Sequence, residues 1–142
     1  MAGSKSDYLE AVVLNLVLGG TAYTPPGTLY LALSTAAYSD AATGSAMTEV
    51  SAAGTGYARL AVTNNATNWP AASGTSPTQK ANGTAMTFPA ATGSWGTVSS
   101  FYICDAASAG NVLYGGDLTT AKAIQTGDTA TFAAGAITVT ED

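Results

Sequence analysis

The sequence predicts a mainly β fold, an antiparallel β-sandwich or barrel of seven to eight short strands with one N-terminal amphipathic helix. Turn residues recur about every 8–14 positions after residue 20, and polar and apolar residues alternate between them. Large core-forming side chains are scarce, because Leu, Ile, Val and Phe together supply 24 of 142 residues. This length suits a single domain over residues 1–142, with a core of thinly packed strands.

The helix is predicted over residues 8–18. Asp7 is the expected N-cap with Glu10 three residues later, and Gly19 supplies the stop. The two carboxylates precede the apolar run, which is the wrong sign for a secretory signal, and the run is too short to span a membrane. We therefore expect no membrane partner and a helix packed through an apolar stripe of Leu9, Val12, Val13, Leu16 and Val17.

The clearest strand is residues 28–34, where Leu29, Leu31 and Leu33 fall on one face. Residues 105–110 and 126–128 are expected to form turns between later strands. The other strands are expected at residues 57–63, 84–88, 98–104, 111–114, 122–125, 129–132 and 137–140.

Two long loops, about residues 35–48 and 64–80, consist mostly of small or uncharged residues without a strand or helix pattern. Unpatterned segments of this length are uncommon in a compact domain unless they are functional or lie against another molecule. The candidate partner-contact residues are therefore Trp69, Pro70, Tyr38 and Asn68. A role for Trp69 in plugging the end of the sandwich is an equal alternative, and this second role is the expected one for Trp95.

Several function classes conflict with the composition. The chain has no His and one Cys, so common zinc sites and His-dependent nucleophilic triads cannot form. Four basic residues against nine acidic ones argue against nucleic acid as a partner. The Asp residues lie at expected turns, where they cap backbone groups. We expect no catalytic residue, metal or cofactor, and a buried Cys104.

Segments along most of the chain together resemble a family of small tailed-phage virion proteins that are commonly labelled tail fibre proteins. Residues 64–80 are the part without a match. The resemblance implies a structural protein of the virion, assembled in the host cytoplasm, and it supplies no catalytic residues. The segments that carry it are SDYLE at 6–10, LYLAL at 29–33, GYAR at 56–59, FPAATGSWG at 88–96, LYGGDL at 113–118 and AGAITV at 134–139.

Within the virion, a compact chain without heptads or repeats favours a capsid decoration protein that binds the major capsid protein and stabilises the shell. Self-association, as a homotrimer, is expected from the small-residue surface and thin core. The alternative is a tail component, a fibre or tip module that contacts tail proteins or a host surface receptor. Outside these structural roles, a two-carboxylate glycosidase and a free carbohydrate-binding module stay open.

Overall fold

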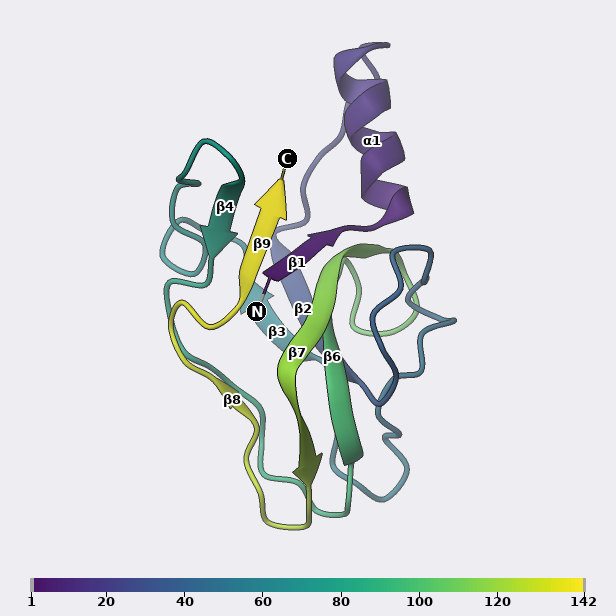
Figure 1. Ribbon diagram of the computed structural model, residues 1–142. Helices are drawn as coiled ribbons and strands as arrows, with labels where there is room; N and C mark the ends of the chain where they lie inside the picture. The colour runs from purple at the N-terminus through teal and green to yellow at the C-terminus, as the bar shows by residue number, and fades with distance from the viewer. Residues whose placement is uncertain (1, 142) are drawn as a thin grey trace.

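The computed structural model describes residues 2–141 and shows one curled seven-stranded sheet, a small two-stranded sheet and a single helix (Figure 1). The strand order in the large sheet is β3-β2-β6-β7-β1-β9-β4, and β5 pairs with β8. The mainly β prediction with one helix near the N-terminus is confirmed. The elements are β1 (Ala2–Lys5), α1 (Asp7–Val17), β2 (Thr28–Ser34), β3 (Leu60–Thr63), β4 (Thr78–Ala81), β5 (Met86–Thr87), β6 (Gly96–Cys104), β7 (Val112–Ile124), β8 (Thr131–Phe132) and β9 (Thr138–Glu141).

Both faces of the central strands are covered. Leu31 and Leu33 of β2 enter the main core with Phe101 of β6, whereas Ala32 and Tyr102 point to the other face and join a smaller core. This split follows from the alternation of side chains along a strand. Segments outside the sheet contribute to the main core as well, so the long connections serve as its covering layer.

Strand boundaries depart from prediction in three places. The expected strands at 111–114 and 122–125 are parts of one long strand, β7. A strand lies inside the predicted loop 64–80, because Thr78–Ala81 pairs with β9. Finally, Ala2–Lys5 forms a strand before the helix and pairs with β9 in parallel, so the sheet is not wholly antiparallel. The loop over 35–48 carries no strand, and only a single bridge from Ser34 to Glu49 flanks it.

The start of α1 also differs from the prediction. Ser6, not Asp7, is the N-cap, and its hydroxyl accepts a hydrogen bond from the backbone N–H of Leu9 at 3.2 Å. Ser6 is fully buried between β1 and the helix, and its hydroxyl donates to the carbonyl of Val112 in β7. Asp7 and Glu10 still lie in the first turn, where negative charge suits the helix dipole.

Candidate partner-binding surface

Helix α1 projects from the sheet instead of packing along it, which corrects the expectation of a packed amphipathic helix (Figure 1). Only Leu9 of the predicted stripe is buried, at 6% exposure. Among the described residues, the exposed large apolar side chains all lie in α1 or at its C-cap: Tyr8, Val13, Leu14, Leu16, Val17 and Leu18. Such a cluster on one short segment marks an interaction surface better than scattered apolar residues do.

The C-terminal end of α1 is the most exposed part of this surface. Leu14, Val17 and Leu18 are 60%, 70% and 79% exposed, and their i, i+3, i+4 spacing puts them on one face. No charged residue occurs from Ala11 to Ser39, so the helix tip and its linker are uncharged. Covering each of these side chains with a partner would contribute about 1–2 kcal/mol. We refer to Leu14, Val17 and Leu18 as the α1 tip.

An apolar cavity of about 420 Å³ lies beside the base of α1. Leu9 of the first helical turn forms one part of its wall, and Tyr23, Pro25 and Pro26 of the linker after α1 form another. Strands β2, β4, β6, β7 and β9 supply most of the rest, including Tyr114, and the loop between β3 and β4 contributes Trp69 and Ala72. We refer to this cavity as the α1 cleft.

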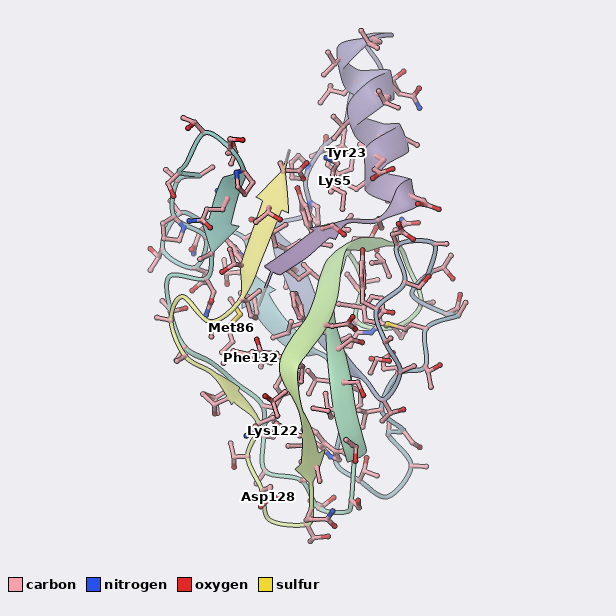
Figure 2. The ribbon with its side chains drawn as sticks, viewed as in Figure 1. Lys5, Tyr23, Met86, Lys122, Asp128 and Phe132 are labelled. Atoms are coloured by element: carbon pink, nitrogen blue, oxygen red, sulfur yellow. The ribbon has the colours of Figure 1, made fainter. Side chains whose placement is uncertain are left out.

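The position of the α1 cleft follows from how the helix is attached. Lys5 of β1 pairs with Glu141 of β9 at the rim, and Figure 2 shows Lys5 and Tyr23 between the helix and β9. Pro25 and Pro26 restrict the end of the linker to extended backbone, and both line the cleft together with residues of the sheet. Burial raises the pKa values of Tyr23 and Tyr114 above the ordinary value for a phenol.

A second, polar centre joins the loops on another part of the molecule. Arg59, the only arginine, has a side chain 2% exposed and makes a two-point ion pair with Glu49, with both N···O distances 2.9 Å. Its remaining N–H groups donate to the carbonyls of Gly44, Ala106 and Ala109 at 2.7–2.9 Å. One guanidinium thus links loop 35–48 to the hairpin loop after β6.

Tyr57 extends this Arg59 network to the sheet. Its hydroxyl donates to Glu49 at 2.8 Å and accepts from the backbone N–H of Leu33 at 2.9 Å. Its ring makes an edge-on contact with Trp95, and burial raises the pKa of the phenol. Trp95 is buried and donates to the carbonyl of Thr55, as its expected plugging role requires.

A family model described as podophage GP4 fiber I protein gp80 matches residues 4–140, nearly the whole chain. The chain belongs to this family. The match confirms the resemblance to phage tail fibre proteins, and it favours the tail alternative over capsid decoration. No curated protein matches the sequence significantly.

In this gp80-family chain the predicted contact residues do not form one surface. The indole of Trp69 is buried in the main core at 7% exposure and forms part of the wall of the α1 cleft. Within residues 2–141 its N–H has no hydrogen-bond partner. Pro70 next to it is exposed. The side chain of Asn68 is engaged within the chain, donating to Thr63 and accepting from Thr84.

Tyr38 lies in the smaller core, away from the Trp69 cluster. Its ring packs on Tyr102 with centroids 5.2 Å apart, and its hydroxyl donates to the carbonyls of Ser4 and Lys5. Its backbone N–H donates to Asp117. Tyr38 therefore fastens loop 35–48 to β1 and β7, and whether any of the four residues contacts a partner stays a prediction.

The carboxylates act as local backbone caps. Asp105 accepts from the backbone and side chain of Asn111, and Asp128 accepts from the N–H of Gln125. Cys104 is fully buried, as predicted, and burial raises its pKa to about 11. Within residues 2–141, no group of three or more His, Cys, Asp or Glu side chains is placed to hold a metal ion, and no helix is long and apolar enough to cross a membrane.

Sequence reasoning missed the two features that organise this surface. It assigned the apolar residues of α1 to the core, although Leu14 and Leu18 lie outside the predicted stripe and make the helix apolar on more than one face. It also passed over the single arginine, which stands among small and apolar residues. A lone Arg in a chain with so few cations was the available signal for a buried ion pair.

Proposed function

We propose that this protein is a non-enzymatic structural component of a podophage tail fibre. It would be carried on the virion and would assemble there with other tail proteins. The proposal takes up the tail alternative in place of capsid decoration. The observation that carries it is the match of a phage fibre family to residues 4–140, a span that includes the helix and strands of both sheets.

The surface of the chain supports a role in assembly. An apolar helix that projects from its own domain requires a protein partner to remove it from water. The uncharged tip offers no group for general acid–base chemistry, and the half-buried carboxylate of Glu49 is held by Arg59 in a structural ion pair. These features favour protein–protein contact over catalysis. Homotrimer formation is part of the proposal, since virion appendages are symmetric assemblies.

The proposal is tested by locating the protein on purified virions. Gold-labelled antibody against the chain should mark the tail, and quantitative mass spectrometry should find on the order of ten copies per particle, set by tail symmetry. A label spread over the head, with hundreds of copies per particle, would instead establish capsid decoration. Absence from particles that carry all other tail proteins would refute both virion roles.

A further inference from the structure

We propose that α1 joins copies of this chain to one another: the α1 tip of one copy inserts into the α1 cleft of a neighbouring copy. The inference deepens the proposed fibre role, on which its biological meaning rests. In this contact the α1 tip of one copy fills the α1 cleft of its neighbour, and the same contact removes the tip from water. Each copy then uses both of its apolar surfaces: its α1 tip inserts into one neighbour, and its α1 cleft receives the tip of another.

The tip has the shape of an inserting element. Leu14, Val17 and Leu18 are exposed and share one apolar face. They lie at the end of a helix that projects from the sheet, as Figure 1 shows. Together their exposed fractions equal about two fully exposed side chains. Gly19 and Gly20 follow directly and carry no side chain, so nothing bulky stands between this face and an approaching surface.

The cleft has the chemistry of a receptor. Its volume of about 420 Å³ falls in the range of 300–1,000 Å³ that holds a small ligand or several side chains. Its lining is mainly apolar, from Leu29, Ile103, Leu113, Val139 and the ring of Tyr114. An apolar occupant gives up no hydrogen bonds of its own to water on entering such a site, whereas a sugar or a charged group would have to be desolvated. Lys80 and Glu141 are the charged members of the lining.

Other occupants fit the charges less well. A helix that lies on a lipid surface is typically rich in Lys and Arg on its polar face, but residues 7–18 hold only the acidic Asp7 and Glu10. A partner steered by charge finds no charged side chain between Ala11 and Ser39. A second copy of the chain fits better, since it presents an uncharged apolar tip to a mainly apolar cleft, in which Lys80 and Glu141 are the charged lining residues.

The size of the contact favours a closed assembly. A stable interface buries about 800 Å² on each partner, more than one helix end provides alone. A tip-into-cleft contact uses different surfaces on the two copies, so a ring of copies buries both surfaces of every member. Closure at three copies would give the homotrimer already proposed, and the α1 tip and the α1 cleft of every copy would then be buried in the ring.

The first test measures mass in solution by light scattering and sedimentation. The wild-type chain should be a multimer of the 14.0 kDa protomer. Leu14→Gln, Val17→Gln and Leu18→Gln together should weaken association by at least about 100-fold, because the buried apolar contact is lost. These positions are exposed and Gln favours helix, so the circular dichroism spectrum should be unchanged. The matched control is Leu16→Gln, an exposed leucine of the same helix on the face turned away from Leu14 and Leu18, and it should associate like the wild type.

The second test identifies the receptor. Copies carrying Leu18→Cys are mixed with copies carrying Ala72→Cys, since Ala72 is an exposed residue of the cleft wall. Oxidation should give a disulfide-linked pair of the two variants. Thr119→Cys, at an exposed position in β7 outside the cleft, replaces Ala72→Cys in the control and should not cross-link. Cys104 is fully buried and does not compete.

Three results would overturn the inference: a monomeric wild type at all concentrations, a multimer unaffected by the three Gln substitutions, or cross-linking of Leu18→Cys copies only with each other. The last would show that the tips pair and that the cleft is not the receptor. These outcomes are separable from failure of the fibre role, because purified protein decides self-association and labelled virions decide location.

Discussion

The Arg59 network and the α1 region differ in how far their side chains are satisfied within a single copy of the chain. Around Arg59, every donor of the guanidinium side chain finds an acceptor within the chain, and Glu49 accepts from two residues. At α1, most large apolar side chains are exposed, and an apolar cavity lies beside the helix. The first region is complete in a single copy and the second is not.

This difference separates what the domain needs for folding from what it offers for assembly. The unpatterned loop 35–48 looked like a surface for partners, but Arg59 and Tyr38 fasten it to the domain. The patterned helix looked like core, but it is left uncovered. A regular sequence pattern thus indicates secondary structure. Whether a surface is available to a partner depends instead on whether its side chains already have contacts within the fold.

The largest expected loss of stability comes from disrupting the Arg59 network. Arg59→Ala removes the donor of five hydrogen bonds and leaves Glu49 without its cation, so we expect the free energy of unfolding to fall by about 3–5 kcal/mol. Urea unfolding followed by tryptophan fluorescence measures the change. Arg59→Lys keeps the charge but cannot make the two-point pair, so it should recover only part of the loss. Full stability in Arg59→Ala would contradict the structural role given to this network.

Within α1, Leu9 of the first turn is buried in the domain and the C-terminal end is exposed. Alanine substitutions should show where along the helix this change occurs. Leu9→Ala removes the buried anchor and should destabilise the domain by about 2–4 kcal/mol. Leu14→Ala, five residues later, should stay within about 0.5 kcal/mol in the dissociated chain, because the side chain is 60% exposed. Thermal unfolding at low protein concentration compares them. Equal losses at both positions would mean that the whole helix packs on its own domain.

A smaller loss of stability is expected at Ser6, which connects β1 to α1. Ser6→Ala removes the N-cap acceptor and should cost about 1–2 kcal/mol. Ser4→Ala is the control, since Ser4 is exposed and its hydroxyl makes no hydrogen bond among the described residues. Helix content from circular dichroism and the urea midpoint are both needed. A loss of stability without any fraying of α1 would place the effect in the bond to Val112 instead of the cap.

The weakest perturbation is alkaline pH, which acts on the buried phenols and thiol and leaves the α1 tip untouched. Burial raises the pKa of Cys104 from 9.0 to about 11 and that of Tyr38 from 10.0 to about 12, and it also raises the pKa of Tyr57. The folded state holds these protons more tightly than the unfolded state, so their contribution is complete below pH 9 and is lost as the pH rises to 12. Urea midpoints measured from pH 8 to 12 should therefore fall only above pH 9. In Tyr38→Phe the decline between pH 10 and 12 should be shallower, and an unchanged slope would contradict the assignment.

Strands with strong side-chain alternation could be predicted from the sequence. Residues 28–34 coincide with β2, because alternate residues of that strand enter two different cores. Strands β1 and β4 could not be predicted in this way. Both are short strands defined by backbone pairing with β9 at the other end of the chain, and β4 is an edge strand with mostly exposed side chains. Periodicity reports burial, and these strands bury too little to show it.

The site was harder to predict than the fold. Trp69 was correctly singled out as an unusual residue, yet its indole lies inward, forming a wall of the α1 cleft. The exposure of Leu14 and Val17 depends on the direction in which the helix leaves the sheet, which Ser6 and the linker prolines determine through three-dimensional contacts. No pattern within residues 8–18 encodes that direction. The family match likewise indicates a fibre role without indicating which surface makes the contact.

The attachment of α1 to β1 has a mechanical consequence. Only Ser6 separates the helix from β1, and β1 is an interior strand, hydrogen-bonded to β7 on one side and β9 on the other. A pull applied to the helix along the strand direction would strain both ladders at once, so their hydrogen bonds would have to shear together instead of opening one at a time. A tether built this way transmits tension into the middle of the sheet and resists rupture when a particle bound to a surface is dragged by flow.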